Sequence, residues 1–184
     1  MEQEFELKLT LKVREAKPDD AQYLYKYCFS TIPEKEVEAE LLSDIEKMGK
    51  GEIHRLVAIA NDHPIGNIRL EFNKYGDPEI AQMEELAVAP PFRRVSDVAD
   101  RLIECISNVA KEKGVKILQV QPQRSESRVV NYYQGQGFTE PPYVTLQKQL
   151  EEAETEDEVE EPEEIEEVEE PKQEGEQQLL VGDE

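Results

Sequence analysis

The sequence predicts an α+β fold in which a mixed central sheet of about six strands is flanked by helices. Two observations favour it. Three strand candidates in a row lie between residues 56 and 88 and are joined only by short turns, as in an antiparallel meander. A segment of helical periodicity then separates the third from a fourth strand candidate, as in a crossover to a parallel strand. A sheet with both kinds of pairing is therefore expected.

The N-terminal part of the chain predicts one strand and two helices. Residues 9–14 alternate apolar and polar side chains as a half-buried strand does. Residues 18–20, Pro-Asp-Asp, open the first helix, since aspartate is a good cap and its charge suits the positive end of the helix dipole. The second helix is expected to begin at Pro33-Glu34 and to end at Gly49. Its apolar face is formed by Val37, Leu41, Leu42, Ile45 and Met48.

The meander strands are expected over residues 56–60, 65–72 and 79–88. The turns between them are predicted at Asn61-Asp62-His63-Pro64 and at Tyr75-Gly76-Asp77-Pro78. The middle strand has an apolar face and a polar face, which are formed by Ile68, Leu70 and Phe72 and by Asn67, Arg69 and Glu71.

The C-terminal half continues with a helix over residues 96–113, which Gly114 ends. A strand over residues 115–120 is expected to pair in parallel with the strand over 79–88. A last helix over 125–136 and a final strand over 143–147 complete the order.

Acidic charge is concentrated at the C-terminus. Residues 151–184 contain 18 acidic side chains and one basic side chain, out of a net charge of −22 for the whole chain. This repetitive segment has no aromatic residue, so it is expected to be a disordered acidic tail that follows the globular domain of residues 1–150. A tail of this kind can keep chains apart or attract a basic protein partner.

Composition also excludes several function classes. The globular part has no basic surplus, so nucleic acid is not an expected partner. No apolar run is long enough for a membrane span, and the acidic start of the chain is unlike a secretory signal, which favours a cytoplasmic protein. Cys28 and Cys105 lack the spacing of metal ligands and are expected to pack as small apolar residues, and no metal site is predicted. His54 and His63 are assigned no chemistry.

Two motifs indicate function. Residues 83–94 read Met-Glu-Glu-Leu-Ala-Val-Ala-Pro-Pro-Phe-Arg-Arg and lead into the third predicted helix. A buried strand that turns into a helix N-terminus is a geometry that binds pyrophosphate. Residues 131–138 read Asn-Tyr-Tyr-Gln-Gly-Gln-Gly-Phe. Together the motifs resemble the GNAT superfamily of acyl-CoA-dependent N-acyltransferases, with its Glu-x-Leu-x-Val-x-Pro strand and its later Phe-Tyr-x-x-x-Gly-Phe.

The resemblance, which extends over about residues 11–150, implies an N-acetyltransferase that moves an acetyl group from acetyl-CoA to a primary amine by direct attack. It makes Glu84 the base that takes the amine proton, with Glu85 as the alternative on the opposite face of the strand. It makes Tyr133 the acid that protonates the leaving CoA thiolate. The residues that it implies for cofactor binding are Leu86, Ala87, Val88, Arg93, Arg94, Val95, Ser96, Asp97, Val98 and Ala99.

The predicted pyrophosphate loop departs from the family pattern, because residues 94–99 contain none of the glycines of Arg-Gly-x-Gly-x-Gly/Ala. Asp97 would repel a phosphate or compete with it for the same amides, whereas Arg93 and Arg94 can compensate by direct pairing. The loop therefore favours an alternative function, a catalytically degenerate GNAT-like binding module whose acidic tail recruits basic partners. The strand motif and the Tyr-x-x-x-Gly-Phe motif favour the enzyme.

The acceptor is left open by the sequence as an amine on a small molecule, a protein N-terminus or a lysine. Only residues 139–142 precede the final predicted strand, so the hairpin that often shapes the family's acceptor site is truncated. An open acceptor site, or one completed by a second subunit in a homodimer, is consistent with this.

Overall fold

A computed structural model describes residues 10–93 and 97–142. The chain divides into two compact units after Pro141, and the fold described here is that of the first. Its strands are β1 Leu11–Glu15, β2 Ile53–Ala60, β3 His63–Glu71, β4 Ile80–Val88 and β5 Ile117–Gln119. Its helices are α1 Ala21–Tyr27, α2 Glu34–Lys50, α3 Val98–Glu112 and α4 Ser127–Gly135, with 3₁₀ turns η1 Pro18–Asp20, η2 Lys74–Gly76 and η3 Pro90–Phe92.

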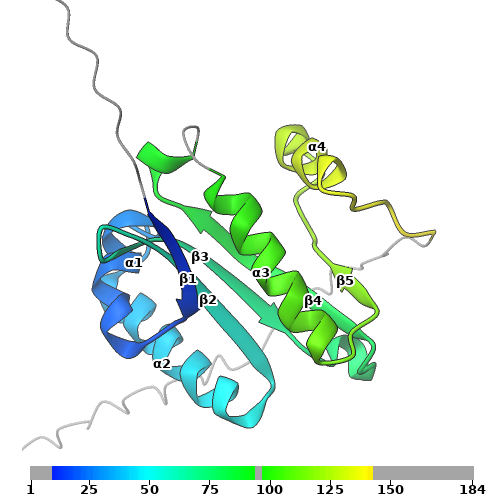
Figure 1. The fold of residues 1–184 in the computed structure, drawn as a ribbon, viewed down its shortest axis with the longest axis horizontal. Helices are drawn as coiled ribbons and strands as arrows, with labels where there is room; N and C mark the ends of the chain where they lie inside the picture. Colours follow the sequence, from blue (N-terminus) through cyan, green and yellow to red (C-terminus); the bar gives the residue numbers. More distant parts are fainter. Residues whose placement is uncertain (1–9, 94–96, 143–184) are drawn as a thin grey trace, which may run out of the picture. The chain divides into compact units, whose positions relative to one another are not determined.

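The strands form one mixed sheet in the order β1-β2-β3-β4-β5 (Figure 1). The first four strands pair antiparallel with their neighbours, and β5 pairs with β4 in parallel, which confirms the predicted fold class and both pairing directions. The described part of the chain contains five strands. The predicted final strand over residues 143–147 and the predicted tail over 151–184 lie outside it.

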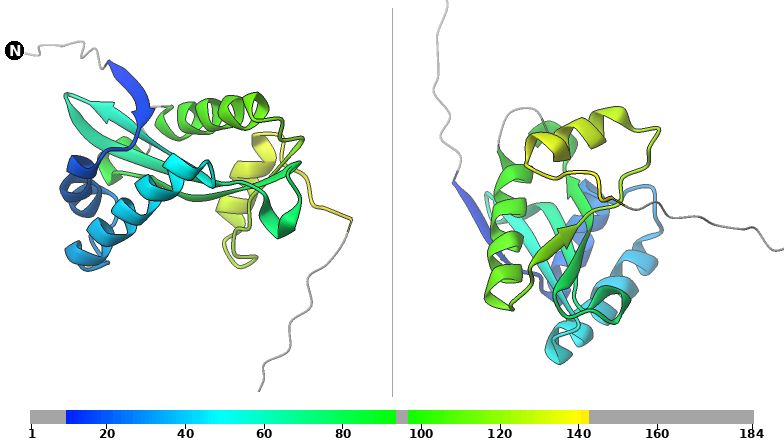
Figure 2. Two further views of the ribbon diagram at one scale, coloured as in Figure 1. Left: turned by 90° about the horizontal axis from the view of Figure 1, so that it is seen from below. Right: turned by 90° about the vertical axis from the view of Figure 1, so that its right-hand side faces the viewer.

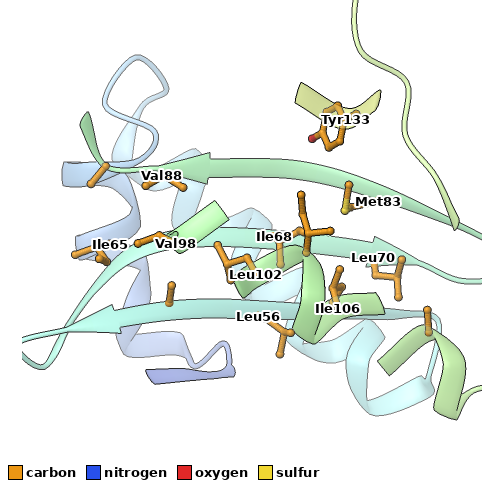
Figure 3. Packing of buried hydrophobic residues seen from close by; sticks show 14 of the residues in the cluster. Leu56, Ile65, Ile68, Leu70, Met83, Val88, Val98, Leu102, Ile106 and Tyr133 are labelled. Carbon is orange, nitrogen blue, oxygen red and sulfur yellow. The ribbon is translucent and has the colours of Figure 1, made fainter. Parts of the chain in front are cut away.

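Helices cover both faces of the sheet. Figure 2 shows α3 on one face and α1 and α2 on the other. The face under α3 has the larger core, in which β3 and β4 contribute Ile68, Leu70 and Met83 and the helix contributes Leu102 and Ile106 (Figure 3). A smaller apolar cluster packs α1 and α2 against β2 through Leu24, Leu41 and Val57. The same face also contains the buried polar side chains of Asp44, Arg55 and Asn67.

The β2–β3 turn is shorter than predicted. It contains only Asn61 and Asp62, which have φ values of 49° and 64°, as in the two-residue hairpin turns that suit the twist of paired strands. His63 and Pro64 were expected in the turn, but they belong to β3.

Helix α2 differs from the prediction in two respects. It continues through Gly49 to Lys50, and the amide of the next residue, Gly51, whose φ is 74°, closes the last turn on the backbone oxygens of Lys47 and Met48. Leu42, which was expected on the buried face, is 48% exposed because α2 turns it away from β2. Gly114 has a φ of 82° after α3 and acts as the predicted stop.

Strand β5 is also shorter than predicted, three residues instead of the six expected over 115–120. None of the described helices is both long and apolar enough to cross a membrane. Cys28 and Cys105 are free thiols that pack, partly buried, against the two apolar clusters.

Candidate active site

Strand β4 loses its neighbour partway along its length. It pairs with β5 only at residues 80–82, whereas on its other edge the pairing with β3 continues to Val88. Among the described residues, no strand therefore covers the β5-side edge of residues 83–88. Backbone N–H and C=O groups on such an edge can bind an extended ligand as they would bind an added strand. The predicted cofactor-binding residues of β4 lie in this segment, namely Leu86, Ala87 and Val88.

A β-bulge interrupts the same segment at Glu85. Between the pairs Arg69–Glu84 and Asn67–Ala87, one residue of β3 lies opposite two residues of β4. Glu85 itself has a φ of 52°. This left-handed conformation costs a residue with a side chain about 1 kcal/mol, so contacts elsewhere must hold it.

Two buried polar side chains hold the bulge. Arg55 of β2 and Asn67 of β3 are 2% and 0% exposed. Nη2 of Arg55 donates to Oε2 of Glu85 at 2.8 Å, and Nδ2 of Asn67 donates to the backbone oxygen of Glu85 at 2.9 Å. Arg55 also donates from Nε to Oδ1 of Asn67 at 2.8 Å and from Nη1 to Oδ2 of Asp44 at 2.5 Å. One guanidinium group thus links α2, β2, β3 and β4.

Glu84 is surrounded by donors. Its carboxylate accepts hydrogen bonds from Nη1 of Arg69, from Nε2 of Gln82 at 2.9 Å and from Nζ of Lys74 at 3.4 Å. Two of these three donors are cations, so both oxygens of this carboxylate take part in ion pairs.

The bulge places Glu84 and Glu85 on the same face of the sheet, contrary to the prediction of opposite faces. Glu84 binds Arg69 and Glu85 binds Arg55, and both guanidinium groups also bind Asp44 on α2. In a regular strand, neighbouring side chains point to opposite faces. Here the extra residue of the bulge and its left-handed φ interrupt that alternation, so two consecutive side chains point to the same face. Both candidate bases therefore belong to one polar network under α2.

The carboxyl group of Glu85 holds its proton unusually well. Its pKa is raised to about 7, chiefly by burial and also by the neighbouring carboxyl group of Glu40 on α2, against the lowering effect of the guanidinium groups of Arg55 and Arg69. A carboxyl group with a pKa near neutrality exchanges protons readily at physiological pH. Glu85 is therefore a candidate for taking up a proton in this part of the molecule.

Glu40, Asp44 and Glu85 approach one another closely, with one oxygen from each lying within 4.8 Å of the others. Such a group of carboxylates is a common arrangement for binding a cation. Here, however, Asp44 is paired with both guanidinium groups and Glu85 with one, so their charge is already largely balanced.

The N-terminus of α3 follows β4 closely. Asp97 occupies the N-cap position, but its side chain makes no capping hydrogen bond, so it does not occupy the first helix amides as the sequence suggested it could. Val98 is fully buried, backbone included, whereas Ala99 is only partly buried, so of these two residues Ala99 has an accessible surface. Nε of Arg93 donates to the backbone oxygen of Val88 at 2.7 Å, which ties the predicted loop to the end of β4. Arg94, Val95 and Ser96 lie outside the described residues.

Tyr133 of α4 packs into the main core beside β4. It is 7% exposed and belongs to the same cluster as Met83 (Figure 3). Its ring meets those of Tyr132 and Phe138 edge-on at 5.5 Å. Burial raises the pKa of Tyr133, so the hydroxyl stays protonated and can serve as a proton donor.

Sequence reasoning missed the polar neighbours of the candidate bases, namely Glu40 and the buried Asp44, Arg55 and Asn67. A signal was present for two of them, because Arg55 interrupts an apolar strand and Asn67 begins the polar face of the next. Nothing in the local pattern joins them to Glu85, which is 30 positions after Arg55.

Comparison with known families supports the fold. The model of the acetyltransferase (GNAT) family matches residues 16–138. The chain belongs to this family. No curated protein sequence matches the chain.

Solved structures with the GNAT fold are similar over most of their length. The aminoglycoside N-acetyltransferase AAC(6')-Iy in complex with CoA has a TM-score of 0.65 at 16% identity, with 78% of this chain and 97% of that chain covered. PaiA N-acetyltransferase from Thermoplasma acidophilum, in complex with coenzyme A, has a TM-score of 0.59 at 19% identity, with coverage of 71% and 90%. A transcriptional regulator from Bacillus halodurans also scores 0.59 at 16% identity, with coverage of 77% and 100%. At these identities the likeness extends to the fold alone.

Proposed function

We propose that this protein is an N-acetyltransferase that moves an acetyl group from acetyl-CoA to a primary amine. The observation that supports this most directly is the unpaired segment of β4, which has a carboxyl group with a raised pKa at its bulge and the side chain of Tyr133 beside it. Family membership and the CoA-bound neighbours support the choice of co-substrate.

Acetyl-CoA would lie along the unpaired edge of β4, with its pyrophosphate at the start of α3. The backbone of residues 86–88 would hold the extended pantetheine arm. The amide of Ala99, near the start of a helix that no side-chain cap occupies, would face the pyrophosphate. Arg93 and Arg94 would supply the positive charge that the loop needs in place of close glycine contacts.

Glu85 is the better supported general base of the two candidates. A protonated alkylamine has a pKa near 10.4, so a base must remove a proton before the nitrogen attacks the acetyl carbon. The pKa of Glu85 near 7 suits that role, whereas Glu84 is engaged by two cations and an amide. The N–C bond then forms, the C–S bond breaks, and Tyr133 gives its proton to the leaving thiolate.

The polar face around Glu85 suits an acceptor that arrives as a cation. Glu40 approaches Glu85 there, and Oε1 of Gln82 is a buried acceptor without a hydrogen-bond partner within the described chain. An ammonium group carries N–H donors that such acceptors can satisfy. Neighbours named as aminoglycoside acetyltransferases act on amines of this class, which favours a small polyamine-like acceptor.

The test is a calorimetric titration of the full chain with acetyl-CoA, followed by release of free CoA thiol in the presence of a diamine. We expect binding at micromolar to millimolar acetyl-CoA and thiol release that depends on the amine. Binding without thiol release from any amine would favour the degenerate binding module. Absence of binding at millimolar acetyl-CoA would contradict the enzyme.

A further inference from the structure

The guanidinium group of Arg55 is buried and donates to three different elements. Its partners are Asp44 on α2, Asn67 on β3 and Glu85 on β4. A buried arginine is expensive unless each of its donors is satisfied, and apolar residues of similar volume often stabilise a core equally well. The network therefore invites a functional explanation.

Asn67 binds the backbone of Glu85, whereas Arg55 binds its side chain. Its amide oxygen accepts from Arg55 and its amide nitrogen donates to the backbone oxygen of Glu85, so the orientation of the amide is determined by its partners. The carboxylate and the carbonyl of one residue are thus held by two neighbouring strands. These contacts lie at the position where φ is left-handed.

We propose that Arg55 and Asn67 are positioning residues, which fix the bulge of β4 and hold the carboxyl group of Glu85 for proton transfer. The inference rests on the proposed function, in which Glu85 is the base. It assigns no contact with substrate to either residue. Arg55 acts through the carboxylate, and Asn67 acts through the backbone conformation that determines where the carboxylate points.

The charges that face Glu85 come from every element around it. They are Glu40 and Asp44 on α2, Arg55 on β2, Arg69 on β3 and Glu84 on β4. Cations favour the ionised form of a carboxyl group and anions favour the protonated form. Removal of the charge of Arg55 should therefore move the titration of Glu85 to higher pH, and removal of the charge of Glu40 should move it to lower pH.

The experiment is a ¹³C NMR titration of the glutamate carboxyl groups in the full chain, with Glu85 assigned from the spectrum of Glu85→Gln. We expect Arg55→Gln to raise the midpoint of Glu85 by about one pH unit or more and Glu40→Gln to lower it. Arg14→Gln is the control, since Arg14 of β1 also pairs with a buried carboxylate, that of Asp20 in η1, but does not contact Glu85. It should leave the midpoint of Glu85 unchanged.

A merely structural role would lower the melting temperature of Arg55→Gln without moving the midpoint of Glu85, and that result would overturn the inference. If Arg55→Gln does not fold, Arg55→Lys keeps a cation but cannot reach all three partners, and a smaller upward shift is expected. An unchanged midpoint in this variant would equally refute the inference.

For Asn67 the variant is Asn67→Asp, which keeps the acceptor for Arg55 and loses the donor to the Glu85 carbonyl. We expect the amide resonances of Glu85 and Leu86 to move and kcat to fall at least tenfold, with KM for acetyl-CoA within twofold of wild type. Unmoved resonances with an unchanged kcat would exclude a positioning role for Asn67. A wild type that transfers no acetyl group would instead refute the proposed function, whatever the titration of Glu85.

Discussion

The hydroxyl of Tyr132 donates a hydrogen bond to Oδ1 of Asp100 at 2.7 Å and thereby joins α4 to the first turn of α3. Gln136, one turn further along α4, donates to the same oxygen at 2.9 Å. The neighbouring Tyr133 instead turns into the core beside β4. Tyr132 thus has a structural role, whereas the role proposed for Tyr133 is chemical. Variants of the two adjacent tyrosines can therefore be compared as a matched pair.

Tyr133→Phe and Tyr132→Phe should have opposite effects on turnover and stability. Tyr133→Phe removes the proposed acid, so kcat should fall by about 10²-fold while the melting temperature stays nearly unchanged. Tyr132→Phe breaks the bond to Asp100 and should cost about 1 kcal/mol of stability with little effect on kcat. Thermal unfolding and steady-state kinetics measure both. Full turnover by Tyr133→Phe, with chemistry rate-limiting, would exclude it as the acid.

Glu85→Gln and Glu84→Gln should separate the two candidate bases. If Glu85 is the base, its replacement should lower kcat/KM by about 10²-fold at neutral pH and abolish the acid limb of the pH profile, which is expected near pH 7 in wild type. Glu84→Gln should leave that limb in place, because Arg69, Lys74 and Gln82 already occupy its carboxylate. If Glu84→Gln abolishes the acid limb and Glu85→Gln leaves it in place, Glu84 is the general base.

The raised pKa of Glu85 also predicts how stability depends on pH. A carboxyl group that titrates near 7 in the folded state and near 4.5 in the unfolded state binds more protons when folded. Its favourable contribution is complete below the unfolded pKa and is lost as pH rises through about 7. Glu85→Gln should therefore gain melting temperature relative to wild type between pH 5 and pH 8.

Glu38→Gln, at an exposed position of α2, is the control for this comparison and should show no such trend. Melting curves of the three proteins across the pH range measure the difference. A constant offset between Glu85→Gln and wild type at all pH values would mean that Glu85 titrates as an ordinary glutamate.

The sequence of the cofactor loop predicts that the affinity for acetyl-CoA depends strongly on the charged side chains of the loop. Since the side chain of Asp97 makes no capping bond, Asp97→Asn should remove a negative charge near the pyrophosphate without loss of stability and should tighten acetyl-CoA. Arg93→Ala combined with Arg94→Ala should weaken acetyl-CoA more than tenfold, or about 1.4 kcal/mol. Calorimetry at two salt concentrations tests both. Unchanged affinity in the double variant would place the pyrophosphate elsewhere.

The acidic tail predicted over residues 151–184 should be dispensable for folding and cofactor binding. Truncation after Leu150 should leave the melting temperature and acetyl-CoA affinity nearly unchanged, because the tail has too few apolar residues to form a core. If the tail attracts a basic protein, truncation should slow that association at low salt and not at high salt. If the truncated protein does not fold, the globular domain extends beyond Leu150.

Local patterns in the sequence determine much of this fold. Alternation in the meander and helical periodicity in α2 and α3 follow from which side chains must leave water, and the glycine after α3 stops the helix because it adopts a left-handed φ. The parallel pairing of β5 with β4 follows from the crossover helix between them. The motif residues of β4, α3 and α4 were found for the same reason, since each motif lies within a single element and its turn.

The tertiary structure alone decided how the candidate site is arranged. The bulge at Glu85 puts both candidate bases on one face of the sheet. The local sequence does not predict this bulge, because the left-handed conformation of a glutamate is unfavourable by itself. Arg55 and Asn67 stabilise it from neighbouring strands. The pKa of Glu85 depends likewise on burial and on charges from α2, β2 and β3. These are contacts between residues far apart in the chain, and only the packed sheet and helices bring them within reach of one another.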